Sequence, residues 1–97
     1  MQHIGVEKID ENGKTLERSE INFADFMVEL YNIEDYKSQF PMMAYVDPYG
    51  DTYLNLLQRP VFVEELQRFN FDKSVIEQVV KFIESAYIHE YIKFIGD

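Results

Sequence analysis

Hydrophobic residues recur every three or four positions near the end of the chain, which is the spacing of one face of an α-helix. Asp72 stands just before this stripe and is a favoured helix-capping residue. The stripe consists of Val75, Ile76, Val79, Phe82, Ile83, Ala86 and Tyr87. The pattern predicts a helix that begins after Asp72 and packs this face against a core.

Two further helices are predicted by the same spacing. The first is capped by Asn22 and ends between Tyr31 and Tyr36; its apolar positions are Phe23, Phe26, Met27, Leu30 and Tyr31. The second covers "PVFVEELQRF", residues 60–69, with Pro60 as its first residue, where a missing N–H costs nothing. Both are amphipathic, so each is expected to cover a sheet or another helix.

An Asn-Gly pair predicts a β-hairpin in the first 21 residues. "HIGVEKI" (3–9) and "TLERSEI" (15–21) flank Asn12-Gly13. Asn-Gly is preferred in type I′ turns, because both central positions of that turn need a positive φ. We therefore expect two antiparallel strands joined by a type I′ turn.

Three more short runs read as strands: "MMAYV" (42–46), "TYLN" (52–55) and "YIKFI" (91–95). The last run is largely apolar on both faces, which is typical of a strand inside a sheet. The predicted order is ββ-α-ββ-αα-β. This order indicates one α+β domain over residues 1–97, with an antiparallel-dominated sheet of about five strands and three helices packed on it.

The charge of the chain limits the classes of partner. Eighteen acids against nine bases give a net charge of −9 over 97 residues. Such a surface repels phosphate backbones and anionic membranes, so neither nucleic acid nor membrane is expected as a direct partner. A basic protein fits the sign better. The chain has no cysteine, shows no signal-peptide pattern and has no apolar run long enough to span a bilayer, so the cytoplasm is the expected location.

The negative charge is concentrated in the middle of the chain. Residues 19–58 hold seven acids and one base, a net charge of −6. Asp25 and Glu29 are four residues apart on a predicted helix, a spacing at which like charges repel. The alternatives are an ordinary solvated surface and a docking surface for a basic partner. Five of the seven tyrosines lie in the same region, and tyrosine is enriched at protein interfaces. The candidate partner-binding residues are Asp25, Glu29, Glu34, Asp35, Asp47, Tyr49 and Asp51.

The segment "DPYGDT" predicts a turn. Asp47-Pro48-Tyr49-Gly50 matches the preferred sequence of a type I turn at every position. Asp47 and Asp51, with Asp97, are oxygen ligands of the kind that hard cations prefer. Because D-x-x-x-D is a weak pattern without the spacing of an EF-hand loop, no metal site is predicted. A metal-dependent hydrolase that uses Asp47 and Asp51 remains the third functional alternative.

The sequence contains no catalytic motif that we can identify. His3 and His89 lie in opposite terminal regions, no G-x-S-x-G surrounds a serine, and the four glycines are scattered. We therefore predict neither an enzyme nor a cofactor.

A resemblance adds to this interpretation. "DPYGDTYLNLLQRPVFVEEL" followed by "YIKFIGD" resembles a group of small bacterial proteins of poorly defined function, from Ala44 to Asp97. As a short, acidic, cysteine-free chain, the protein is also similar to immunity proteins of contact-dependent growth inhibition systems. This second resemblance implies binding and neutralisation of a cognate toxin domain, often a nuclease, by occlusion of its basic cleft. A stand-alone acidic interaction or regulatory domain is the second alternative.

Overall fold

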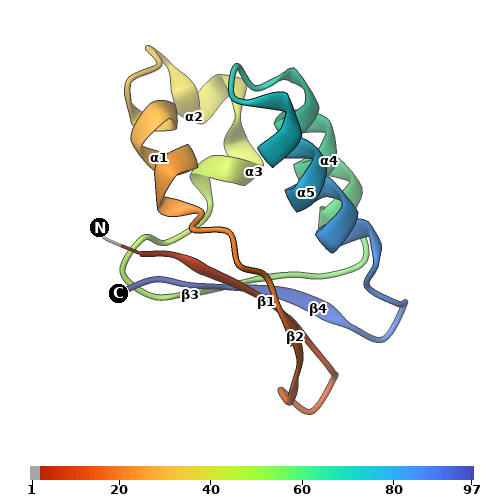
Figure 1. Cartoon of the computed structure of the whole chain (residues 1–97). Coiled ribbons are helices and arrows are strands. Elements are labelled where there is room, and N and C mark those ends of the chain that lie inside the picture. Colours follow the sequence, from red (N-terminus) through yellow and green to blue (C-terminus); the bar gives the residue numbers. More distant parts are fainter. Residues whose placement is uncertain (1–2) are drawn as a thin grey trace.

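The computed structural model describes residues 3–97 and shows an α+β fold in which helices cover one face of a single antiparallel sheet (Figure 1). The strands are β1 (Gly5–Ile9), β2 (Thr15–Arg18), β3 (Asp51–Leu54) and β4 (Tyr91–Ile95). Their order in the sheet is β2-β1-β4-β3. The final strand therefore lies inside the sheet between β1 and β3, as its two apolar faces predict.

Five helices are found in the described part of the chain: α1 (Ala24–Tyr31), α2 (Tyr36–Gln39), α3 (Pro41–Ala44), α4 (Gln58–Arg68) and α5 (Lys73–Glu84). The prediction of three helices and about five strands is thus corrected to five helices and four strands. The fold class is confirmed.

The first hairpin is confirmed, but its turn is not type I′. In residues 3–97, the one non-glycine residue with a positive φ is Asp35, so Asn12 does not adopt the required conformation. Gly13 alone has φ 87°, and Asp10 and Lys14 close a longer loop in which the Asp10 amide donates to the Lys14 carbonyl at 2.9 Å. The Asp10 side chain accepts the amides of Asn12 and Lys14 at 2.9 and 2.8 Å. This carboxylate favours the longer loop with glycine in the left-handed position.

An aromatic cluster forms the centre of the core between the sheet and the helices. Phe23, Phe62 and Phe94 are fully buried, and their ring centroids lie 4.9 to 5.8 Å apart. Phe94 comes from β4, Phe62 from α4, and Phe23 from the residue before α1. Phe26 stacks on Phe23 at 4.8 Å. These contacts join the start of α1 and helix α4 to β4, one of the two inner strands of the sheet.

The segment predicted as a strand at 42–46 is not a strand: residues 42–44 belong to helix α3, and residues 45 and 46 follow it. This correction has an identifiable cause. Pro41 is the first residue of α3, and the amides of Met42 and Met43 donate to the Glu65 side chain at 2.9 and 2.8 Å. Glu65 lies in α4 and is 1% exposed. A distant side chain therefore satisfies the free amides at the start of α3, a partner that the local pattern of residues 42–46 does not reveal. Tyr45 consequently follows α3 and does not face Tyr53 across a hairpin.

The other helices differ from their predicted bounds at the ends. Helix α1 begins at Ala24, and the Asn22 side chain accepts the amides of Ala24 and of Ile4 in the neighbouring chain segment. Helix α4 begins at Gln58, two residues before Pro60. Helix α5 begins after Asp72, whose side chain accepts the Val75 amide at 3.1 Å as predicted, but it ends at Glu84. Tyr87 lies beyond this end and is 76% exposed, so it is not part of the buried stripe.

Candidate protein-binding face

The structure places six of the seven predicted binding residues in three exposed segments on one side of the molecule. Asp25 and Glu29 lie on the outer surface of α1, Glu34 and Asp35 in the connection to α2, and Asp47 and Tyr49 in the turn before β3. Figure 1 shows α1, α2 and this turn at the left, with α4 and α5 at the right. We call Asp25, Glu29, Tyr31, Glu34, Asp35, Asp47 and Tyr49 the acidic side.

The turn at Asp47 has the predicted form. The Gly50 amide donates to the Asp47 carbonyl at 3.5 Å, and the Tyr49 amide donates to the Asp47 side chain at 2.9 Å. The Thr52 hydroxyl oxygen accepts the Asp47 amide at 2.8 Å. These bonds use the aspartate to shape the turn, and they leave Tyr49 68% exposed at its tip.

The turn is also fixed to the end of β4. The Gly96 amide donates to the Gly50 carbonyl at 2.8 Å, and a side chain on Gly96 would overlap the carbonyl group of Pro48. A Cβ at this position would also lie 2.8 Å from the Asp47 carbonyl oxygen. Glycine is therefore required here for close approach of two backbone segments.

We expect Gly96→Ala to lower the free energy of unfolding by about 1–3 kcal/mol, because backbone atoms must shift to admit the methyl group. The midpoint of urea unfolding measures this change. Gly5→Ala is the matched control, since a Cβ there would meet its nearest neighbour, His3, at an ordinary 3.7 Å. Equal losses in the two variants would contradict the role of Gly96 in holding the turn.

Tyr31 connects the end of α1 to the turn. Its ring centroid lies 5.2 Å from that of Tyr36, and Tyr31 remains 38% exposed. Partial burial raises the pKa of the Tyr31 hydroxyl, and Tyr36, Tyr49 and Asp47 raise it further. The Asp47 carboxylate is thus close enough to act electrostatically on the Tyr31 hydroxyl. This hydroxyl is neutral at physiological pH, as an unshifted tyrosine hydroxyl also is, so it can donate a hydrogen bond.

Asp51 differs from the other predicted acids. It lies in β3, and its carboxylate pairs with Lys93 of β4 at 3.7 Å. Within residues 3–97, no Lys, Arg or His nitrogen lies within 4.0 Å of the carboxylates of the acidic side. Four of the described basic residues instead pair with Glu7, Glu17, Asp51 and Glu64. The charge available to a partner is therefore that of Asp25, Glu29, Glu34, Asp35 and Asp47.

Basic residues are scarce in this region. Residues 20–50 hold six acids and one base, Lys37, for a net charge of −5. The other eight basic residues belong to the first hairpin, α4, α5 and β4. More than half of the net charge of −9 is thus carried by the third of the chain that forms α1, α2, α3 and the turn.

The three aspartates considered as metal ligands have other contacts. Asp47 shapes its turn, Asp51 pairs with Lys93, and the Asp97 side chain accepts the His3 amide at 3.4 Å. Across residues 3–97, no group of three His, Asp or Glu side chains is arranged to hold a metal ion. Over the same residues, every helix is too short or too polar to cross a lipid bilayer.

The structure also shows an exposed apolar surface that sequence reasoning missed. Leu57 is 81% exposed and Ile88 is 64% exposed, and with Leu56, Val61 and Tyr87 they form what we call the apolar patch. These residues come from the connection before α4, its first turn, and the connection after α5. The "LNLL" segment and the "YI" before His89 were signals for it, because apolar residues between regular elements have no core face to join.

Comparison with known proteins adds no relative to these observations. The chain matches no protein-family model, no curated protein sequence and no solved structure at a significant level.

Proposed function

We propose that the protein is an immunity-type inhibitor that binds a basic toxin domain, of the nuclease type, and occludes its active cleft. The observation that carries the proposal is the combination on the acidic side of five carboxylates without a cationic partner and two exposed tyrosines, Tyr31 and Tyr49. A nuclease needs a basic cleft for its polyanionic substrate. Carboxylates can occupy such a cleft in place of phosphates.

The two kinds of residue have different roles in this proposal. Exposed carboxylates create a long-range potential that accelerates encounter with a basic partner. Tyrosine rings have little effect at long range but bury area at contact, which slows dissociation. The acidic side offers both exposed carboxylates and two exposed tyrosines, Tyr31 and Tyr49.

The test uses the protein encoded by the reading frame beside this gene, provided that it is basic. Co-expression of the two proteins is expected to relieve toxicity in growing cells, and the purified pair is expected to form a complex. A neighbouring protein that forms no complex, and whose toxicity is not relieved, would contradict the proposed function.

The double reversal Asp25→Lys and Glu29→Lys is expected to slow association about tenfold at low ionic strength, because it removes steering charge from the acidic side. Stopped-flow association rates at several salt concentrations measure this effect. The difference between the two proteins should shrink as salt rises, since exposed charges are screened over about 10 Å at 0.1 M.

A matched control separates the position of charge from its amount. Glu11→Lys and Glu77→Lys change the net charge by the same amount, but these exposed residues lie at the hairpin tip and on α5. The control pair should slow association far less. Equal slowing by both double variants would show that net charge alone matters and would overturn the assignment of the acidic side.

A further inference from the structure

A groove with a charged residue in its lining lies beside the apolar patch and shares Leu56 with it. The groove has a volume of about 290 Å³ and lies between the start of α4 and the end of α5. Its lining residues are Leu56, Arg59, Pro60, Val63, Ile83, Glu84 and Ala86. The lining is thus mostly apolar and includes one basic residue, Arg59, and one acidic residue, Glu84.

Arg59 is held in place but has no anionic partner. It is 6% exposed, and its Nη2 donates to the Tyr87 carbonyl at 3.1 Å. In residues 3–97, no carboxylate lies within 4.0 Å of it, and Glu84 likewise lacks a basic partner. Every enclosed side-chain nitrogen or oxygen in these residues has a hydrogen-bond partner, so the remaining donors of Arg59 are reachable from outside. A largely buried and unpaired cation is stabilised strongly by an incoming carboxylate.

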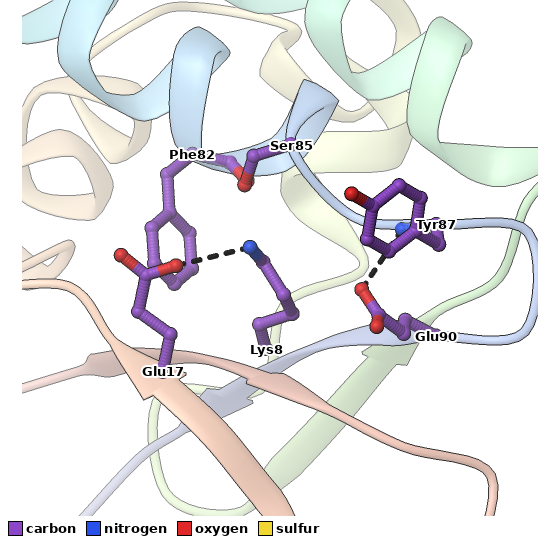
Figure 2. Close-up of polar contacts among 6 residues, drawn as sticks. All are labelled: Lys8, Glu17, Phe82, Ser85, Tyr87 and Glu90. Carbon is purple, nitrogen blue, oxygen red and sulfur yellow. Dashed lines mark hydrogen bonds and ion pairs between the residues drawn. The ribbon is translucent and has the colours of Figure 1, made fainter.

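Hydrogen bonds hold the connection that presents Tyr87 and Ile88. The Ser85 hydroxyl donates to the Phe82 carbonyl at 2.7 Å. The Tyr87 amide donates to the Glu90 carboxylate at 2.8 Å (Figure 2). The Glu90 amide in turn donates to the Tyr87 carbonyl at 3.0 Å. Tyr87 is nevertheless 76% exposed. Exposed apolar side chains on an ordered segment lose little conformational entropy on binding, which favours an interface.

We infer that the apolar patch and its groove form a twofold interface with a second copy of this chain. In a twofold interface, residue i of one copy meets residue j of the other, and j meets i. Arg59 of one copy can therefore meet Glu84 of the second, and Glu84 can meet the second Arg59. The groove carries one unpaired charge of each sign, so it is complementary to itself.

The charge distribution also favours a second copy of this chain as the partner at this surface. Two chains of net charge −9 repel each other, but α1, α2 and the turn lie at the opposite side of the molecule from α4 and α5 (Figure 1). Contact through the apolar patch keeps the two acidic sides apart. It also leaves both of them free for another partner, so this inference does not depend on the proposed function.

The exposed area of the apolar patch is sufficient for a specific dimer. The five patch residues are between 43% and 81% exposed. With about 200 Å² for a large apolar residue, they expose about 600 Å² per copy. Two copies would bury about 1,200 Å², at the lower end of the range for specific interfaces. We expect a dimer that dissociates on dilution.

Light scattering after size exclusion, over a range of loading concentrations, tests the inference. The expected mass approaches twice 11.6 kDa at the highest concentration and falls on dilution. Leu57→Asp and Ile88→Asp, each made singly, should give monomers, and neither removes a buried side chain. Leu16→Asp is the matched control: Leu16 is 46% exposed in β2, so this variant should remain dimeric.

Glu84→Arg tests the charge pairing, because it would bring two cations together at each Arg59 and should weaken the dimer at least tenfold. A monomer at all concentrations would overturn the inference, as would a mass that keeps rising beyond the dimer. A dimer that persists in Leu57→Asp and Ile88→Asp would place the interface elsewhere. If Leu57→Asp and Ile88→Asp dissociated the dimer but Glu84→Arg did not, the Arg59–Glu84 contact would be rejected, and with it the twofold arrangement.

Discussion

Replacing Glu65 with alanine is expected to lower the free energy of unfolding by about 2–5 kcal/mol. The Glu65 side chain is 1% exposed and accepts the amides of Met42 and Met43. Its removal leaves two amide donors at the start of α3 without a partner, and each unsatisfied buried donor costs about 1–3 kcal/mol. A cavity adds to this loss. The change in the free energy of unfolding is measured by urea unfolding, with circular dichroism as the signal.

Two variants make this prediction specific. Glu64→Ala changes the same residue type one position earlier, where the side chain is exposed and pairs with Arg68 on the same helix, so it should cost no more than about 0.5 kcal/mol. Glu65→Gln keeps one acceptor oxygen and should give an intermediate loss. If Glu65→Ala were no more destabilising than Glu64→Ala, the two amides would not depend on this side chain.

Glu65 also shows why part of the fold could not be predicted from sequence. The run "MMAYV" has the composition of a strand, and nothing within five residues of it marks a helix except Pro41. The deciding partner is 22 residues away from Met43 along the chain and buried on another helix. Local patterns cannot identify such a contact. Glu65 itself reads as an ordinary surface acid of α4, although its neighbour Leu66 is a core residue.

Elements whose determinants are local were predicted correctly. Helix α5 has an aspartate cap and a long apolar stripe, and both are properties of adjacent residues. The inner position of β4 followed from the apolar residues on both of its faces. The hairpin was predicted for the same reason, but its turn type was wrong because the Asp10 carboxylate bonds to two loop amides. Asn12-Gly13 alone does not determine the turn.

The candidate site was partly predictable, because charge is visible in a sequence but pairing is not. The excess of acids over residues 19–58 was evident, and Figure 1 shows that α1, α2 and the turn before β3, which carry most of them, lie on one side of the molecule. The ion pair of Asp51 with Lys93 depends on the register of β3 and β4, which the sequence does not give. The exposure of Tyr31 was not predicted, for a related reason. Its helical spacing made it a core residue, whereas the structure leaves it 38% exposed beside the turn.

The double variant Tyr31→Ala and Tyr49→Ala is expected to weaken the complex with the toxin partner by about 3 kcal/mol, roughly a hundredfold in Kd. Tyr49 is 68% exposed at the tip of a turn that is fixed on both sides, so its ring is already positioned for contact. Tyr31 is also exposed on the acidic side, and the charge of Asp47 contributes to the raised pKa of its hydroxyl. Aromatic rings at the centre of an interface commonly provide most of the binding energy.

Kinetics distinguish this effect from the loss of charge. The tyrosine variant should dissociate faster while its association rate and the salt dependence of that rate stay nearly unchanged, because no charge is removed. Surface plasmon resonance against the partner measures both rates. Tyr53→Ala with Tyr91→Ala is the matched control, since these rings are 46% and 37% exposed on β3 and β4. Should the control pair accelerate dissociation as much as the test pair, the contact surface would be the sheet, and the acidic side would act in steering alone.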